Sequence, residues 1–262
     1  VVHPLPQAIV NPSGPLAFCD GGSVTLDAGS GFKSYKWSNG KYGQILTAKD
    51  AGAYSVTITD YNSCVNTSAA TQVTIYPLPS TNVTVNGPTA FCEGSKSTYL
   101  VAPSGYPSYQ WVKGGNNISG ATDKKYYPIS SGTYKVTITD NFNCQNQSDG
   151  VVATMLNLPK AKVTIDGSKN ICNGETRTLT ASAGSGYSYQ WLKNSVNING
   201  ATQMSYVVST AGDFKCKVTD ANGCKENSKI TTITSICKEA ETRDNPASGI
   251  NLSIFPNPSA NV

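Results

Sequence analysis

Eight cysteines are the residues of this chain best suited to covalent chemistry. They are Cys19, Cys64, Cys92, Cys144, Cys172, Cys216, Cys224 and Cys237. An even number of cysteines in small, turn-rich units favours disulfides in an oxidising compartment. No CxxC pair occurs and His3 is the only histidine, so the sequence does not indicate a zinc site.

The other reactive residue types do not assemble a catalytic site. His3 stands near the start of the chain, and no Ser–His or Cys–His arrangement can be built around it. Glycosidase chemistry needs two converging carboxylates, whereas the 16 acidic residues are scattered through predicted turns. No glycine-rich phosphate loop opens a helix. We therefore predict that this chain is not an enzyme; a catalytic domain upstream of it would be compatible with the sequence.

Charge and hydropathy exclude two further classes of partner. The formal net charge is only +4, and no block of Lys or Arg is present. Nucleic-acid binding is therefore not expected. No apolar run approaches the length of a membrane span, so we expect no membrane segment. We also expect the protein to be a monomer.

One phrase of residues recurs three times along the chain. In its second copy it opens on "GPTAFCEGS" (87–95), continues through "SYQW" (108–111) and "SGTYKVTITD" (131–140), and ends on "NLP" (157–159). The first copy is shorter between its Trp and its late strand, while the second and third copies differ by a constant offset of 80 residues. The repeat predicts three tandem modules.

The landmarks of the repeat set the module boundaries. "HPLP" at 3–6 matches "YPLP" at 76–79, so the first residues should end a preceding module. The expected segments are the end of that module (1–6), module 1 (7–79), module 2 (80–159), module 3 (160–237), a polar linker (238–249) and the truncated start of a further domain (250–262).

Each module is predicted to be a two-sheet β-sandwich. In "YSVTITD" (54–60) apolar residues alternate with polar ones, which places Tyr54, Val56 and Ile58 on one face of a strand. About seven short strands separated by Gly, Pro and Asn turns are typical of a sandwich. A module of this size has a small core, so covalent staples are expected.

Aromatic residues recur at fixed places in the repeat. The three tryptophans share one position: Trp37, Trp111 and Trp191. They could stack on sugars, but recurrence in every module favours packing between the sheets. Tyr54 and Tyr134 follow a Gly by two residues and are expected to bond back to the preceding loop. Phe214 holds this place in module 3 and has no hydroxyl.

The order of Trp and a late G-x-Y strand resembles the immunoglobulin fold. The complete phrase, "GPTAFCEGS…SYQW…SGTYKVTITDNFNC…LP", resembles the tandem Ig-like or PKD-like repeats of secreted and cell-surface Bacteroidetes proteins. This resemblance covers residues 1 to about 237. It implies an all-β fold of three tandem immunoglobulin-like sandwich modules in an elongated array.

The last residues carry a second resemblance. "NLSIFPNPSANV" (251–262) is similar to the opening strand of the type IX secretion (Por) C-terminal sorting domain, whose hallmark is a hydrophobic pair followed by "PNP". The matching residues are Ile254, Phe255, Pro256, Asn257 and Pro258. The similarity implies export through the periplasm and outer membrane by the type IX machinery, although the sorting domain is present only in part.

The chain departs from antibody domains in its cysteines. Strand B carries none, and we expect Leu26, Tyr99 and Leu179 at its inward position. The simplest pairing keeps one bridge in each module and joins the extra two cysteines: Cys19–Cys64, Cys92–Cys144, Cys172–Cys224 and Cys216–Cys237. We favour this pairing because it uses every cysteine.

A geometric difficulty keeps a second pairing open. The start of strand B and the turn after strand F lie at opposite ends of a sandwich, about 25 Å apart, whereas a disulfide needs Cα atoms within about 7 Å. Bridges that cross between modules would avoid this difficulty. They would be Cys19–Cys144, Cys92–Cys224 and Cys172–Cys237, with Cys64 and Cys216 left over.

Two kinds of ligand are conceivable. Asp60, Asp140 and Asp220 end the same strand in each module, where they could bind Ca²⁺ or, as we favour, cap a turn. No other cofactor is indicated. Module 2 is rich in tyrosine, and exposed aromatic rings can stack on sugars. The candidate glycan contacts are Tyr106, Tyr126 and Tyr127.

Two functions remain after these exclusions. The first is a rigid spacer that presents an upstream domain at the cell surface, in a secreted or surface-attached protein. The alternative is a glycan-binding or adhesion module of a surface protein or polysaccharide-degrading enzyme, with a polysaccharide or cell-surface glycan as partner.

Overall fold

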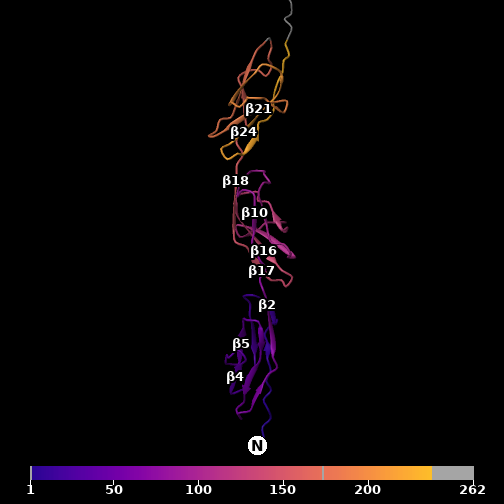
Figure 1. The fold of residues 1–262 in the computed structure, drawn as a ribbon, viewed down its shortest axis with the longest axis vertical. Coiled ribbons are helices and arrows are strands. Elements are labelled where there is room, and N and C mark those ends of the chain that lie inside the picture. The colour runs from indigo at the N-terminus through magenta and orange to yellow at the C-terminus, as the bar shows by residue number, and fades with distance from the viewer. Residues whose placement is uncertain (1, 173, 238–262) are drawn as a thin grey trace, which may run out of the picture. The chain divides into compact units, whose positions relative to one another are not determined.

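The computed structural model describes residues 2–172 and 174–237. The linker and the sorting motif, including Phe255, Pro256, Asn257 and Pro258, lie outside the described residues. Every regular element in the described part is a β-strand (Figure 1). None of the described segments is a helix long and apolar enough to cross a membrane. The chain divides into two compact units, unit 1 (Val1–Asn157) and unit 2 (Leu158–Val262).

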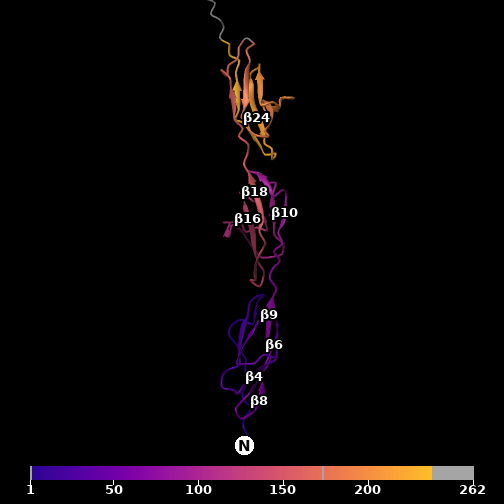
Figure 2. The same ribbon diagram turned by 90° about the vertical axis from the view of Figure 1, so that its left-hand side faces the viewer.

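Module 1 is the first sandwich of unit 1. Its strands are β1 (Asn11–Pro12), β2 (Ala17–Cys19), β3 (Val24–Asp27), β4 (Ser34–Trp37), β5 (Ile45–Ala48), β6 (Gly52–Tyr54), β7 (Val56–Thr59), β8 (Val65–Thr67) and β9 (Thr71–Tyr76). One sheet has the order β1-β3-β5. The facing layer combines β2-β9-β6 with β4-β7-β8, because β6 and β7 follow each other across Ser55. Figure 2 shows β9 beside β6.

Module 2 repeats this plan in unit 1. Its strands are β10 (Thr84–Asn86), β11 (Ala90–Cys92), β12 (Tyr99–Val101), β13 (Ser108–Lys113), β14 (Asn116–Asn117), β15 (Lys125–Tyr126), β16 (Gly132–Thr139), β17 (Gln145–Gln147) and β18 (Val151–Leu156). The two sheets are β10-β12-β15 and β11-β18-β16-β13-β14, with β17 also paired to β16.

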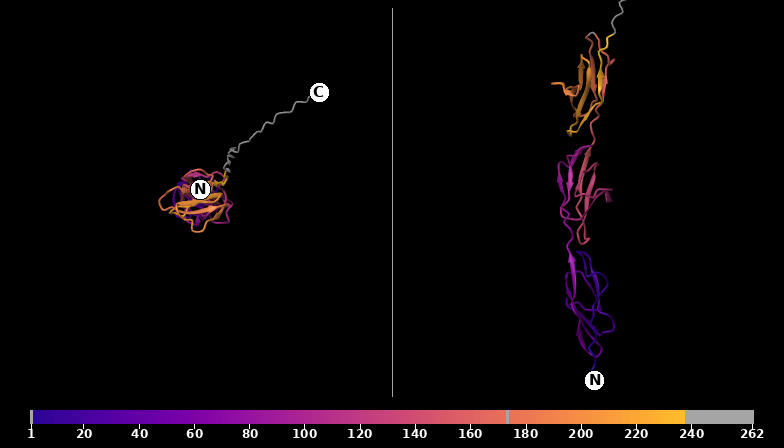
Figure 3. Two further views of the ribbon diagram at one scale, coloured as in Figure 1. Left: turned by 90° about the horizontal axis from the view of Figure 1, so that it is seen from above. Right: turned by 90° about the vertical axis from the view of Figure 1, so that its right-hand side faces the viewer.

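Module 3 forms unit 2 and has the same two layers, drawn in orange in Figure 3. Its strands are β19 (Val163–Ile165), β20 (Arg177–Ala181), β21 (Ser188–Lys193), β22 (Val196–Asn197), β23 (Ser205–Val208), β24 (Gly212–Thr219), β25 (Lys225–Asn227) and β26 (Thr231–Ile233). The sheets are β19-β20-β23 and β22-β21-β24-β25, with β26 on β24. These two-sheet β-sandwiches confirm the predicted fold class of three tandem immunoglobulin-like modules.

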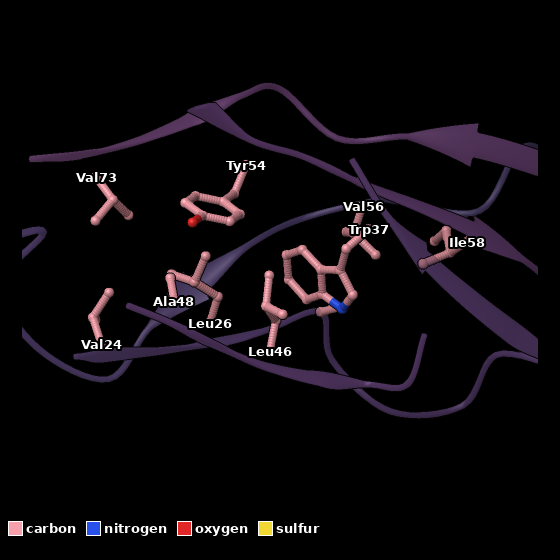
Figure 4. Packing of buried hydrophobic residues seen from close by; sticks show 10 residues of the cluster. Val24, Leu26, Trp37, Leu46, Ala48, Tyr54, Val56, Ile58 and Val73 are labelled. Atoms are coloured by element: carbon pink, nitrogen blue, oxygen red, sulfur yellow. The ribbon is translucent and has the colours of Figure 1, made fainter. Parts of the chain in front are cut away.

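Each module has its own apolar core, built from the inward residues of both sheets. Figure 4 shows the core of module 1, where the indole of Trp37 lies among Leu46, Val56 and Ile58. The predicted alternation is confirmed, since Tyr54, Val56 and Ile58 are all buried. The other cores centre on Trp111 with Leu100, and on Trp191 with Leu179.

The three tryptophans are core residues, as predicted. At most 1 % of each is exposed. Their indole N–H groups donate hydrogen bonds to backbone carbonyls of Gly43 (2.9 Å), Asp123 (2.8 Å) and Gln203 (2.9 Å). Their faces are therefore not available to a sugar.

The expected tyrosine corners are also present. The Tyr54 hydroxyl donates to the Asp50 carbonyl at 2.9 Å, and the Tyr134 hydroxyl donates to the Ser130 carbonyl at 2.7 Å. Both acceptors lie four residues upstream, so the hydroxyl fixes the loop that enters the strand. Phe214 keeps the packing and lacks this bond.

A serine supports a bulge before the last strand of every module. In module 2, Thr137 pairs with Gln147 of β17 and Tyr134 pairs with Val151 of β18, so the stretch that joins β17 to β18 holds one extra residue relative to β16. The backbone N–H of Val136 lacks a ladder partner there and donates to the Ser148 hydroxyl at 2.9 Å. Ser68 and Ser228 accept the matching N–H groups in the other modules. The serine recurs at the same repeat position in all three modules, so the sequence contains a signal for this bulge.

Candidate functional site: the joint between modules 1 and 2

A disulfide joins module 1 to module 2. Cys19 bonds to Cys144, with a Cα–Cα distance of 5.5 Å and a sequence separation of 125 residues. The favoured pairings Cys19–Cys64 and Cys92–Cys144 are therefore wrong, and the crossing alternative is confirmed at this joint. Because both partners lie in unit 1, the bond is a property of one compact unit.

The strand pairing explains why Cys19 reaches the next module. β2 runs parallel to β9, with Ala17 opposite Thr74 and Cys19 opposite Tyr76. Cys19 therefore lies beside the last residue of the final strand, at the end where the chain leaves module 1. The turn after β7, which holds Cys64, lies at the other end. The predicted separation of these two places is correct, and it excludes a bridge within the module.

Cys144 is presented by a tight turn between β16 and β17. The carboxylate of Asp140 accepts the backbone N–H of Phe142 at 2.8 Å and that of Cys144 at 2.8 Å. Asn143 adopts a left-handed φ of 62° in this turn. The strand-end aspartate thus shapes the turn that carries the cysteine.

Three further contacts close the joint around its hinge. The rings of Tyr76 and Phe142 stack with centroids 3.9 Å apart and planes inclined by 7°. The side-chain amide of Asn146 donates to the Pro79 carbonyl at 3.0 Å. The backbone N–H of Ser80 donates to the Tyr106 hydroxyl at 2.9 Å. The joint therefore combines a covalent bond, a ring stack and two hydrogen bonds.

The same aspartate turn recurs in the other modules. Asp60 accepts the N–H of Cys64 at 2.7 Å, and Asp220 accepts the N–H of Cys224 at 2.9 Å. These hydrogen bonds confirm the expected turn-capping role. Binding of Ca²⁺ by these residues stays a prediction.

The remaining cysteines follow the crossing alternative where the structure settles them. Cys172 bonds to Cys237 within unit 2, with a Cα–Cα distance of 5.4 Å. The predicted pairs Cys172–Cys224 and Cys216–Cys237 are therefore wrong. Cys92 and Cys224 are each disulfide-bonded. They hold the repeat positions of Cys19 and Cys144, so their mutual pairing stays a prediction from the sequence.

Cys216 and Cys64 are the two cysteines outside disulfides in the described part of the chain. Cys216 is fully buried on β24, at the core position that Val56 and Val136 hold in the other modules. Its inward direction keeps it away from Cys237, which lies beyond the last strand. Burial raises the pKa of the Cys216 thiol to about 11. Cys64 is only half-buried.

The three candidate glycan contacts do not form one surface. Tyr106 lies at the joint through its bond to Ser80. Tyr126 points into the core of module 2, where its ring stacks on Trp111 with a centroid distance of 5.6 Å. Partial burial raises the pKa of the Tyr126 hydroxyl. Tyr127 alone is exposed, on the opposite side of the same strand end.

The outer face of module 2 holds a different group around Tyr127. The predicted inward position of Tyr99 is wrong: Leu100 is buried, and Tyr99 faces outward beside Tyr127, with ring centroids 5.6 Å apart. The ammonium of Lys125 lies 3.6 Å from the Tyr99 centroid and 4.9 Å from the Tyr127 centroid. A hydrogen bond to Tyr127 raises the pKa of Lys125.

Two surface hollows lie at matching places in modules 2 and 3. One in unit 2 runs from Ala161–Ile165 to Lys229–Thr231, and one in module 2 runs from Thr81–Val83 to Ser148–Val151. Each lies between the first and last strands of its module, so both belong to the same place in the repeat. No group of three or more His, Cys, Asp or Glu residues suited to a metal was found among the described residues.

Comparisons with known proteins return folds of this kind. No family model matches the chain, and no curated protein matches it. An I-band fragment of titin, domains I67–I69, is 12 % identical, with 90 % of this chain and 100 % of that chain covered and a TM-score of 0.43. Three N-terminal domains of the bacteriophage RB49 outer capsid protein Hoc are 16 % identical, covering 88 % and 100 %, with a TM-score of 0.32. Extracellular domains 3–5 of Drosophila OTK are 13 % identical, covering 87 % and 97 %, with a TM-score of 0.33.

Proposed function

We propose that this chain is a non-catalytic extracellular spacer, which holds another domain of the same protein at a distance from the cell surface. The observation that carries the proposal is the Cys19–Cys144 bond between consecutive modules. A spacer must resist bending at its hinges, and a proline hinge alone leaves rotation about the neighbouring bonds. A covalent bond beside the hinge removes most of that freedom.

The remaining contacts of the joint act in the same direction. The Tyr76–Phe142 stack and the Asn146–Pro79 hydrogen bond constrain the chain on both sides of Pro77. Each contact alone is worth about 1 kcal/mol. The disulfide holds the partners close, so these weak contacts form at high effective concentration.

The proposed location is outside the cytoplasm. Disulfides persist in oxidising compartments, and this chain uses six of its eight cysteines in them. We further propose export by the type IX machinery of a Bacteroidetes cell, on the basis of the motif at 254–258. Removing 250–262 from the full-length protein should retain it in the periplasm; undiminished surface display would contradict this route.

Domain orientation in solution tests the spacer. Residual dipolar couplings measured on the oxidised chain should fit modules 1 and 2 with one alignment tensor. The double variant Cys19→Ser/Cys144→Ser should require separate tensors for the two modules. Cys64→Ser removes an unpaired thiol only and serves as the matched control. Independent tensors for the two modules of the oxidised wild-type chain would contradict the proposal.

A glycan-binding role is the second candidate, and the group of Tyr99, Lys125 and Tyr127 favours it. These residues stand on the outer face of module 2 only, where modules 1 and 3 place Thr25 and Thr178 at the position of Tyr99. The Lys125 ammonium already covers the Tyr99 ring, so Tyr127 is the ring left for stacking on a sugar. Affinity electrophoresis in soluble polysaccharides should show retardation that Tyr127→Ala abolishes. Equal mobility with every polysaccharide would remove this candidate.

A further inference from the structure

Module 1 carries, at the end opposite to the joint, the same groups through which module 2 binds module 1. Asp60, Cys64 and Asn66 hold the repeat positions of Asp140, Cys144 and Asn146. In module 2 this set forms the receiving half of the joint: Cys144 bonds to Cys19, and the side-chain amide of Asn146 donates a hydrogen bond to the Pro79 carbonyl.

The two turns have the same local geometry. The carboxylate of Asp60 accepts the Cys64 N–H at 2.7 Å, and that of Asp140 accepts the Cys144 N–H at 2.8 Å. The N–H of each aspartate donates to the carbonyl of its cysteine at 3.0 Å. Ser63 and Asn143 both adopt a left-handed φ, of 66° and 62°. Cys64 is therefore presented as Cys144 is.

The first residues of the chain already occupy part of this receiving half. The side-chain amide of Asn66 donates to the Pro6 carbonyl at 2.7 Å, as that of Asn146 donates to the Pro79 carbonyl at 3.0 Å. Pro6 and Pro79 end the matching stretches "HPLP" and "YPLP". Residues 3–6 thus contact module 1 at the asparagine position at which residues 76–79 contact module 2. Cys64, unlike Cys144, forms no disulfide.

We infer that Cys64 is the attachment site for the cysteine of a preceding immunoglobulin-like module, which stands upstream of residue 1 in the longer protein. The partner cysteine occupies the position of Cys19 in that module, at the end of a strand paired parallel to the module's last strand. The inference rests on the repeat geometry and holds whether or not the array serves as a spacer.

The bond forms by two thiol–disulfide exchanges with a small disulfide such as oxidised glutathione. The Cys64 thiolate attacks one glutathione sulfur, which forms a mixed disulfide and releases one glutathione thiolate. The thiolate of the partner cysteine then attacks the Cys64 sulfur and releases the second. Two protein thiols lose two electrons and two protons in total, and one glutathione disulfide becomes two thiols.

An extended chain tests the inference directly. A copy of residues 80–153 is placed before Val1, so that "VVHPLP" replaces "TMLNLP" as its last strand and hinge. The cysteine of the copy that corresponds to Cys144 is changed to Ser, since it would lack a partner. After refolding in a glutathione buffer, peptide mapping without reduction should find the cysteine that corresponds to Cys92 bonded to Cys64.

Thiol counting gives the controls. The extended chain should hold one free thiol, Cys216, after denaturation, against two in the original chain. Adding Cys64→Ser to the extended chain should free the cysteine of the copy, which restores a count of two. A Cys64 that stays alkylatable in the folded extended chain would overturn the inference.

A measurement on the original chain tests the inference even if the extended chain does not fold. Cys64 should react with Ellman's reagent in the native state with full stoichiometry, while Cys216 should react only after unfolding. A native Cys64 that fails to react would overturn the inference, because it could not be reached by a partner. Covalent dimers through Cys64 in the original chain would assign the site to a second copy instead and would also overturn it.

Discussion

Cys216 shows how one core position accepts the thiol side chain of cysteine in place of the isopropyl group of valine. It is fully buried where Val56 and Val136 lie in the other modules, and its backbone N–H bonds to Ser228 as theirs bond to Ser68 and Ser148. A buried thiol is a small hydrophobic group. The position therefore accommodates a small apolar side chain of either kind.

This placement predicts a contribution of Cys216 to the pH dependence of the stability of module 3. Its pKa is 9.0 when unperturbed and about 11 in the folded state. Above pH 9 the unfolded thiol loses a proton that the folded thiol keeps, so the free energy of unfolding of module 3 falls as pH rises from 9 to about 11. Cys216→Val should remove this component. Urea titrations of both proteins across this range measure it, and parallel pH profiles would contradict it.

The tyrosine corner predicts opposite effects at matched positions. Tyr134→Phe should lower the free energy of unfolding of module 2 by about 1 kcal/mol, because it leaves the Ser130 carbonyl without its hydroxyl donor. Phe214→Tyr should raise that of module 3 by a similar amount, since the Thr210 carbonyl lies four residues upstream. Urea unfolding followed by NMR resolves the modules. Changes of the same sign in both would contradict the hydrogen-bond explanation.

At the scale of the strand, the serine bulge is the feature that every module shares. The extra residue before the last strand removes a backbone partner from one N–H of the central strand, and a buried unpaired N–H costs about 1–3 kcal/mol. Ser148 supplies the missing acceptor and donates to the Asp149 carbonyl at 3.0 Å. A small hydroxyl side chain is therefore needed there in all three modules.

Burial predicts the size of the effect when this serine is removed. Ser148 is 3 % exposed, so Ser148→Ala should leave the Val136 N–H unpaired and destabilise module 2 by about 2 kcal/mol. Ser68 is half-buried, so water can reach the Val56 N–H, and Ser68→Ala should cost about half as much. Urea midpoints of the two variants measure the difference. Equal losses would show that burial does not set the effect.

The elements also show which features follow from sequence. Trp111 and Tyr134 could be placed in the core because their positions recur and because apolar alternation fixes the face of a strand. Tyr99 was misplaced by one residue because "TYLV" (98–101) offers two apolar faces, although the repeat aligns Leu100 with Leu26 and Leu179 and so selects the face that is buried. The cysteine pairing depends on the parallel register of β2 on β9, a contact between residues far apart in sequence. Nothing local specifies it.

At the scale of the molecule, the Cys19–Cys144 bond changes the covalent path along the chain. A force applied between residues 19 and 144 passes through the disulfide, so the backbone between Cys19 and Cys144 carries none of it. Those residues include nearly the whole of modules 1 and 2. The bond therefore shields the two cores from unfolding by tension, which non-covalent contacts at the joint could not do. An extracellular spacer that is pulled by its attached domain needs this property.

Single-molecule stretching measures the shielding. A chain of 125 residues extends by about 3.5 Å per residue, or about 440 Å in all. Under oxidising conditions the unfolding of unit 1 should lack this length, and a thiol reductant should restore it as two further unfolding steps. Bridges confined to single modules would instead hide two shorter lengths of about 50 residues each. The released length thus distinguishes a disulfide between the modules from disulfides within them. Release of the full length without a reductant would contradict the proposed role.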